Sequence, residues 1–202
     1  MQKLGSTDEF SGQVFKRLDF AGEKLASRKF YDCTFVACNF NEATFDGCKF
    51  NDCRIDECNL SLVKFDGTSF FDTEFEDCKL IGIDWTRAAW PQIKLSSPVN
   101  FSNSNLSDST FFGLFLGQMR MTGCKAHAVD FSETDCRHAD FSHTELFRSV
   151  FHHADLSGAD FSYAEAYAID VFNNRIEGAK FSLPEAVSLL ESLGIDLVVT
   201  DE

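Results

Sequence analysis

Large apolar residues recur at every fifth position of the chain. Counting from Phe10, each multiple of five up to position 95 holds Phe, Leu, Ile or Trp. The series resumes one residue out of frame at Phe101 and runs to Phe181. Three positions of this second series are not large: Ala126, Cys136 and Ala166. Because helices repeat near 3.6 residues and strands at 2, a sustained period of five predicts a repeat architecture.

A second row of small residues lies two places before the large ones. Its members include Cys33, Cys38, Ala43, Cys48 and Cys53. The resulting pattern, small-x-large-x-x, directs two of every five side chains into a core and three toward water. The first repeats depart from it, since the small position is occupied by Gln13, Leu18, Glu23 and Arg28. We therefore expect these repeats either to pack loosely or to cap the fold.

This pattern resembles the pentapeptide-repeat family over about residues 10–181. The resemblance implies an all-β fold, a right-handed quadrilateral β-helix in which each pentapeptide forms one side and about 20 residues form one coil. Coils stack at about the 4.8 Å spacing of hydrogen-bonded strands, so about nine coils would give a rod about 40 Å long. The large residues would fill the lumen, and the small ones would let the wall turn at each corner.

The repeats divide the chain into three parts. Residues 1–9 precede the β-helix, residues 10–181 form it with a frame break near 96–100, and residues 182–202 follow it. The last part predicts a short amphipathic α-helix, with a capping box of Ser182 and Glu185 and a stop at Gly194. This helix would cover the end of the rod or join two chains as a homodimer, and the two roles are compatible. The dimerisation residues would be Leu183, Ala186, Leu189, Leu190 and Leu193.

The N-terminal residues lack the apolar middle of a signal peptide and no run reaches the roughly 20 apolar residues of a membrane span, so we expect a cytoplasmic protein without membrane contact.

The eight cysteines are interpreted as buried thiols. In coils of about 20 residues, Cys38, Cys58 and Cys78 would form one interior ladder. A zinc site needs ligand pairs that converge on a tetrahedron, whereas these cysteines lie along separate walls. We therefore predict no metal and no cofactor.

Negative charge is concentrated in the second half. The formal net charge is −14, with 16 acidic and 12 basic residues up to Leu95, and 16 against 6 after it. Acids directly before the central residues of that half would stack in rows, with Asp135 beside Asp155 and Asp140 beside Asp160. These rows are the predicted partner-binding surface. Its residues are Asp130, Asp135, Asp140, Glu145, Asp155, Asp160, Glu165 and Asp170.

Such a rod would resemble duplex DNA in charge and shape. A dimer about 85 Å long, with twice the chain's charge of −14, would have about one net negative charge per 3 Å, against about one per 1.7 Å in duplex DNA. Direct nucleic-acid binding is disfavoured because there is no basic groove. For any single carboxylate, a solvated face that keeps the rod soluble is the simpler interpretation.

Within the family, the sequence is most similar to bacterial topoisomerase-protecting proteins, and among these to the albicidin-immunity type. The similarity rests on "CNLSL", "WTRAAWPQIK" and "FSLPEAVSLLESL". It implies binding to DNA gyrase or topoisomerase IV on the saddle that normally holds DNA, with protection from a topoisomerase poison and hence antibiotic resistance or self-immunity. Quinolone-resistance members carry loops of several residues, whereas a single extra residue is evident here, which argues against protection from quinolones.

Two other classes of function are open. A generic interaction rod, such as a scaffold or a secreted effector, would use the same solenoid without a topoisomerase. An enzyme is disfavoured, because the histidines are assigned to outward positions on different sides with no nucleophile or Gly-rich phosphate loop beside them. These histidines are His127, His138, His143, His152 and His153. We therefore expect no catalytic residues.

Overall fold

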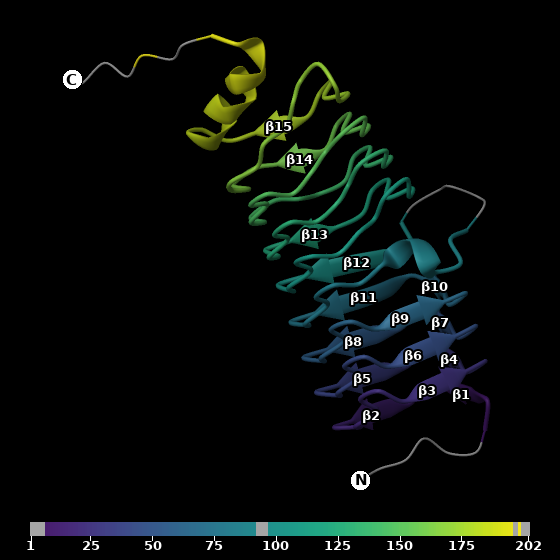
Figure 1. Cartoon of the computed structure of the whole chain (residues 1–202). Helices are drawn as coiled ribbons and strands as arrows, with labels where there is room; N and C mark the ends of the chain where they lie inside the picture. The colour runs from purple at the N-terminus through teal and green to yellow at the C-terminus, as the bar shows by residue number, and fades with distance from the viewer. Residues whose placement is uncertain (1–6, 92–96, 196–197, 199–202) are drawn as a thin grey trace.

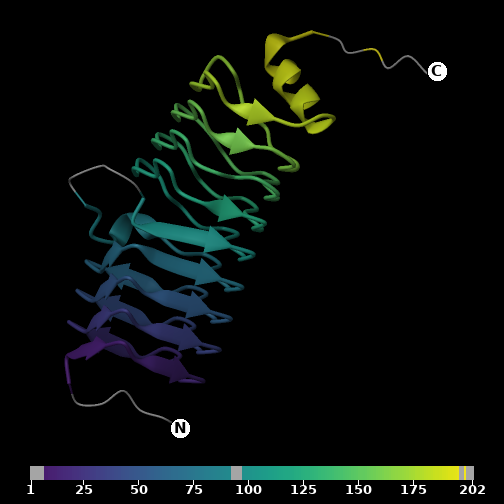
Figure 2. The ribbon, with the colours of Figure 1, turned by 180° about the vertical axis from the view of Figure 1, so that it is seen from behind.

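The computed structural model describes residues 7–91, 97–195 and 198, and shows a four-sided solenoid with one short helix near its C-terminus (Figure 1). The chain winds through about eight coils of a right-handed β-helix, close to the nine counted from the sequence. Each wall pairs in parallel with itself one coil further along. The view from behind shows the same single stack of coils (Figure 2).

Walls one and two contain the two largest parallel sheets. Wall one contains β1 (Glu9–Ser11), β4 (Lys29–Tyr31), β7 (Lys49–Asn51) and β10 (Ser69–Phe71). Wall two contains β2 (Val14–Lys16), β5 (Thr34–Val36), β8 (Arg54–Asp56), β11 (Thr73–Glu76), β12 (Val99–Ser102) and β13 (Met121–Thr122). Wall two ends with β14 (Asp160–Phe161) and β15 (Lys180–Phe181), while wall one continues through the bridged residues Phe115, Asp135, Asp155 and Arg175.

The other two walls rely more on single bridges. Wall three pairs through Asp19, Asn39, Asn59, Lys79, Asn105, Lys125, Glu145 and Glu165. Wall four begins with β3 (Lys24–Ala26), β6 (Thr44–Asp46) and β9 (Lys64–Asp66). It continues through Asp84, Thr110, Asp130 and Val150. Beyond Ser102 most sides are single bridges joined by turns.

Stacked aromatic rings fill the lumen, which confirms the inward assignment of the large residues. Phe30 pairs with Phe50 one coil further on, and their ring centroids lie 5.0 Å apart. On wall four the stack continues past the middle of the rod, with neighbouring centroids 5.0–5.7 Å apart. Its rings are Phe45, Phe65, Trp85, Phe111, Phe131 and Phe151. Each such pair contributes about 0.5–1.5 kcal/mol beyond its burial.

The residue two places after each large one turns the chain at a corner. It has left-handed backbone, with φ of 62° at Gly12 and 53° at Asp52. Nine of the chain's 12 glycines stand at such positions, because only glycine adopts this conformation without a Cβ penalty. The five-residue pattern therefore has a third regular position, which the analysis of large and small residues did not identify.

The first coil is a cap. Leu18 stands at a small-residue position, yet its side chain is buried in the lumen. Arg28 stands at another such position, where its guanidinium donates to the carbonyl oxygen of Thr7 and pairs with Asp8. The larger side chains are tolerated here because, among the described residues, no complete coil precedes them.

One coil in the middle of the rod contains six more residues than a regular coil, the six-residue excursion. Ile55 pairs with Phe75 across 20 residues, whereas Phe75 pairs with Phe101 across 26. The departure begins at η1 (Trp85–Arg87), a single 3-10 turn. The expected central residue Leu95 lies outside the described residues. The prediction of one extra residue was therefore wrong. An insertion of six residues shifts a five-residue period by the same single position as an insertion of one, so the period alone cannot distinguish them.

The coil before the terminal helix slips out of frame. Phe151 pairs with Ile169 across 18 residues, and Tyr167 enters the core beside it. The expected central residue Ala166 is exposed instead. The larger apolar side chains of Tyr167 and Ile169 fill the lumen better than alanine. Regular pairing resumes where Arg175 bridges to Asp155.

The predicted terminal helix is present as η2 (Glu185–Leu193), but it is a 3-10 helix and not the expected α-helix. It stops at Gly194 as expected. The predicted capping box is not formed. The hydroxyl oxygen of Ser182 instead accepts a hydrogen bond from the N–H of Tyr163 at 3.0 Å, which ties the segment to the coil below. Within the described part of the chain, neither helix has the length and apolar character needed to cross a membrane.

The cysteines are eight buried free thiols that bond to the backbone as hydroxyls do elsewhere. The Sγ of Cys58 accepts from the N–H of Cys38 at 3.2 Å, and that of Cys78 accepts from the N–H of Cys58 at 3.4 Å. Thr68 occupies an equivalent position, where its hydroxyl accepts from the N–H of Cys48 and donates to the carbonyl of Phe45. The predicted ladder of Cys38, Cys58 and Cys78 is confirmed.

We expect the native thiols to resist alkylation. Burial raises the pKa of Cys124 to about 12 and that of Cys53 to about 11, so few thiolates exist at pH 8. A maleimide should label the native protein slowly, and all eight thiols after denaturation. Cys58→Ser should melt within a few degrees of wild type, because serine can make the same backbone hydrogen bonds. Fast labelling of the folded protein would contradict the buried assignment.

Candidate partner-binding surface

The predicted acids hold the turns of the solenoid. The Oδ1 atom of Asp140 accepts a hydrogen bond from the N–H of Ser142 at 2.9 Å. The same contact, at 2.9–3.1 Å, follows three other aspartates: Asp130, Asp155 and Asp160. Asn105 makes it too, with the N–H of Ser107 at 3.0 Å. An amide therefore serves this turn as well as a carboxylate does.

The acids stack as predicted on three walls. Asp135 bridges to Asp155 on wall one, and Asp140 bridges to Asp160 on wall two. Glu145 bridges to Glu165 on wall three. The 20-residue spacing places each pair in adjacent coils, at about the 4.8 Å distance between neighbouring strands.

Cations flank the stacked acids, which the sequence analysis missed. Arg175 follows Asp155 in its row and pairs with it at 3.7 Å. Lys180 follows Asp160 and pairs with it at 2.9 Å. Further contacts come from Arg137 to Asp135 at 2.7 Å and from His127 to Glu145 at 2.9 Å. On walls one and two, a cation thus follows two stacked acids.

Asp130 and Asp170 do not form a row. Val150 stands over Asp130, and the slip of the last coil moves Asp170 beside His152. The backbone N–H of Phe172 donates to the Asp170 carboxylate at 2.8 Å and lowers the pKa of that group. Among the described residues, neither acid forms an ion pair with lysine or arginine within 4.0 Å, so neither charge is neutralised by such a partner.

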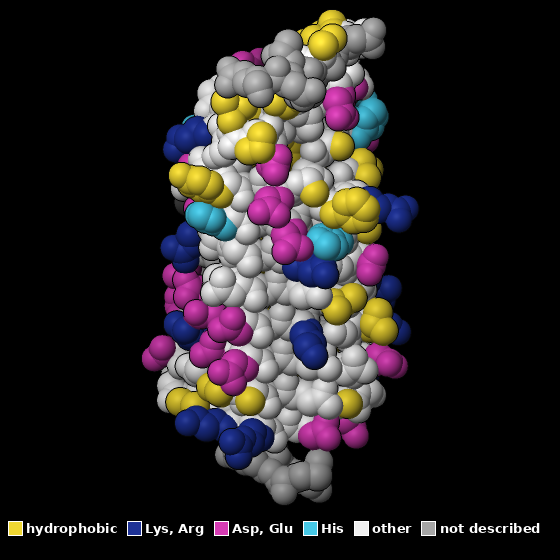
Figure 3. Space-filling view, turned by 90° about the vertical axis from the view of Figure 1, so that its left-hand side faces the viewer, with side chains coloured by type: hydrophobic (Ala, Val, Ile, Leu, Met, Phe, Trp, Pro, Cys, Tyr) yellow, Lys and Arg dark blue, Asp and Glu magenta, His cyan; other side chains and the backbone are white. Residues whose placement is uncertain are grey.

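A second acidic area, which the sequence analysis did not assign to the partner-binding surface, lies on the N-terminal half. Asp56 and Glu76 stack on wall two, and Arg54 pairs with both. Glu57 and Asp77 occupy the following corner. Figure 3 shows one side of the rod, on which Asp and Glu side chains occur along both halves with Lys and Arg among them.

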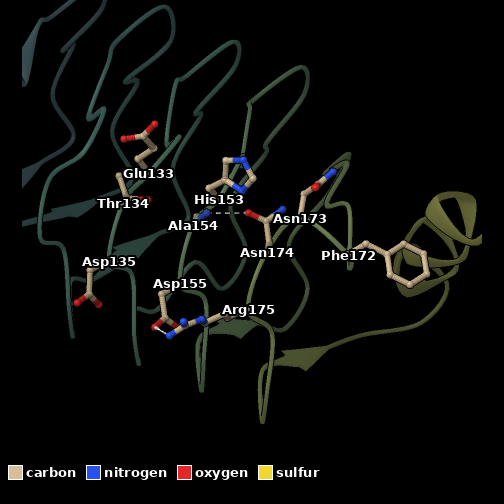
Figure 4. Close-up of a pocket in the computed structure, with 10 residues that line it drawn as sticks. All are labelled: Glu133, Thr134, Asp135, His153, Ala154, Asp155, Phe172, Asn173, Asn174 and Arg175. Carbon is tan, nitrogen blue, oxygen red and sulfur yellow. Dashed lines mark hydrogen bonds and ion pairs between the residues drawn. The ribbon is translucent and has the colours of Figure 1, made fainter.

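A groove of about 480 Å³ opens at the corner between walls four and one (Figure 4). The irregular last coil forms one rim, where the side-chain oxygen of Asn174 accepts from the N–H of Ala154 at 2.9 Å. The Asp155–Arg175 pair lies along its floor. The lining residues are Glu133, Thr134, Asp135, His153, Ala154, Asp155, Phe172, Asn173, Asn174 and Arg175.

The histidines are spread over this half of the rod. The rings of His152 and His153 lie 4.0 Å apart, and the ring of His143 stacks on Tyr163 at 4.9 Å. Over the described residues, no three side chains of His, Cys, Asp or Glu converge as metal ligands would.

Of the five predicted dimerisation residues, two are partly buried and three are exposed. Leu189 packs against the last coil, and Ala186 is also partly buried. Leu183, Leu190 and Leu193 are exposed, and Leu183 has 80% of its surface in solvent. The exposed Val187, which the sequence analysis missed, adds to this apolar side.

If η2 joins two chains, Leu190→Asp combined with Leu193→Asp should give a monomer. Both side chains face solvent in the single chain, so charges there should prevent apolar association without disturbing the coils. Light scattering would report half the wild-type mass, while the circular dichroism of the β-helix persists. An oligomer of unchanged mass would restrict this helix to a capping role.

Solved structures of QnrB1, described as a plasmid-mediated fluoroquinolone resistance protein, align with nearly the whole chain. A trypsin-treated variant is 22% identical with a TM-score of 0.70, and the alignment covers 94% of this chain and 97% of the other. The full-length protein is 20% identical with a TM-score of 0.55, covering 93% and 100%. No curated protein matches the sequence. The structural likeness establishes the solenoid fold.

The family comparison agrees with the fold. The pattern described as "Pentapeptide repeat region" matches residues 28–96 and 83–165, which together make up well over half of the chain. The match spans the six-residue excursion and includes coils on both sides of it. The five-residue period, the parallel stacking of its central residues and this match all coincide, and the chain belongs to the pentapeptide-repeat family.

Proposed function

We propose that the chain binds DNA gyrase or topoisomerase IV as a mimic of duplex DNA and protects the enzyme from a topoisomerase poison. The stacking of carboxylates in adjacent coils of a narrow rod carries this proposal. With a net charge of −14, the rod presents a long negative surface to an enzyme whose DNA-binding saddle is basic. Binding would not require catalysis by this chain.

The fold shared with QnrB1 supports the same class of function, because that protein is described as conferring fluoroquinolone resistance. The six-residue excursion removes the sequence-based argument against quinolones. The sequence segments similar to the albicidin-immunity type favour a natural poison. Both kinds of poison therefore belong in the test, and homodimers formed through η2 would lengthen the mimic.

A generic interaction rod is the second candidate. The alternation of acids with Arg175 and Lys180 favours it, because a surface of mixed sign suits many protein partners. This alternative requires no topoisomerase.

A supercoiling assay with purified gyrase distinguishes the two. The protein should restore supercoiling by poisoned gyrase at low molar ratios and inhibit the unpoisoned enzyme at high ratios, since it would compete with DNA. Polyglutamate of equal total charge is the control that separates shape from charge. If the protein neither binds gyrase nor alters supercoiling at low salt, topoisomerase mimicry is wrong and the interaction rod becomes the better description.

A further inference from the structure

We propose that wall four of the C-terminal half is the face by which the rod docks, and that its partner is a protein surface with lysines and arginines around an apolar pocket. This docking face comprises residues 110–113, 130–133, 150–153 and 168–173. The inference rests on the proposed function and specifies which side of the rod would contact the topoisomerase.

Charge distinguishes the docking face from the other walls. None of its four segments contains a lysine or an arginine. Its acids are Asp130, Glu133 and Asp170, and none of the three has an ion-pair partner within 4.0 Å among the described residues. On walls one and two, by contrast, Arg175 and Lys180 already neutralise stacked acids. The formal charge within these four segments is therefore negative at neutral pH.

Exposed apolar side chains occupy the same face. Phe112 is 46% exposed, Val150 is 50% exposed and Phe172 is 73% exposed. Neither phenylalanine stacks on another ring within the described part of the chain. On wall three, by contrast, Phe147 contacts the ring of His127 at a centroid distance of 5.8 Å. Unstacked aromatic residues within a polar surrounding are typical of the residues that anchor protein interfaces.

The groove lies at the edge of this face. Glu133 and His153 line it, and Phe172 projects from its rim (Figure 4). The frame slip at Ile169 shapes the rim of this groove, because it displaces the following segment from the regular wall. A long cationic side chain could enter the groove toward Glu133, while its aliphatic stem covers apolar surface.

The sign of the charge selects the partner. A nucleic acid would be repelled by three uncompensated carboxylates. A second copy of the chain would bring the same acids together across a two-fold axis, so this face is unsuited to a homodimer. A basic protein surface complements the charges, and a pocket in that surface would be needed to bury Phe112 and Phe172. A basic DNA-binding saddle such as that of the proposed topoisomerase partner would meet the charge condition.

The docking face and the stacked rows should affect different rate constants. Charges on walls one and two would act at a distance and speed encounter, whereas buried aromatic anchors would slow dissociation. We therefore measure binding to immobilised gyrase by biolayer interferometry and compare two variants. One combines Phe112→Ala with Phe172→Ala, and its matched control combines Leu62→Ala with Phe71→Ala, two residues that are also exposed.

The docking-face variant should dissociate at least about tenfold faster, with an association rate within about twofold of wild type. Its circular dichroism melt should match that of wild type, and the control should bind normally. If the double variant unfolds, Phe172→Ala alone gives the same readout at the most exposed of the three apolar positions. If wild type binds and the docking-face variant dissociates at the wild-type rate, this inference alone is overturned. The same holds if the dissociation rate of the control rises as much as that of the variant. Absence of wild-type binding overturns the proposed function as well.

Discussion

Phe45→Asp is expected to abolish cooperative folding. Phe45 is buried in the lumen, and its ring centroid lies 5.4 Å from those of Phe40 and Phe50 and 5.7 Å from that of Phe65. Losing the buried ring costs about 3–5 kcal/mol. An unpaired carboxylate in a dry interior adds several kcal/mol more. The sum approaches the 5–15 kcal/mol that stabilises a typical domain.

The solenoid makes this substitution more damaging, because each coil contacts only its neighbours and a lost coil removes support from both sides. Thermal melts followed by circular dichroism measure the effect. Phe71→Asp is the matched control, since it introduces the same charge at a phenylalanine of which 61% is exposed. The control should melt within a few degrees of wild type. A wild-type melt for Phe45→Asp would show that the large residues do not fill the lumen.

The fold was predictable because one short pattern repeats under the same physical constraint. Most sides of the solenoid place a large residue in the lumen, and the pairing of Phe30 with Phe50 shows the coil length that the family resemblance implied. The thiol ladder through Cys58 follows from the same spacing. Because the repeats are regular, a position that departs from the pattern can be recognised by comparison with the other repeats.

The irregular coils were not predictable from the period. A frame of five cannot distinguish one extra residue from six, so the excursion after Trp85 was underestimated. At the last coil the period placed Ala166 inside, whereas packing selected Tyr167 and Ile169. At the last coil the volume of the lumen, rather than the count of residues, decides which side chain points inward.

The candidate surface was predicted in part. The stacking of Asp135 on Asp155 followed from the spacing, and so could have the position of Arg175, which continues the same row. The predicted surface consisted of acids alone and therefore did not include this cation. The exposure of Phe172 could not be predicted, because it depends on the slip of the coil that contains it.

Replacing four stacked acids by asparagine is expected to weaken binding to gyrase about 30-fold at low salt. The positions are Asp135, Asp140, Asp155 and Asp160. Four exposed ionic contacts at about 0.5 kcal/mol each amount to about 2 kcal/mol, which corresponds to this change in Kd. Most of the effect should appear in the association rate and should shrink as salt is added, because long-range attraction is screened. The fold should persist, since asparagine holds the same turn at Asn105.

The matched control replaces Asp46, Asp52, Asp66 and Asp72 by asparagine. It removes the same charge from the N-terminal half and also releases cations, because Asp46 pairs with Lys24 at 2.7 Å and Asp66 with Arg87 at 2.6 Å. If a dimer presents its central, C-terminal halves to the enzyme, the control should lose far less affinity. Equal losses would mean that binding follows total charge, including the acidic area on wall two. Unchanged affinity in both variants would exclude the stacked rows from the site and leave the exposed phenylalanines as its determinants.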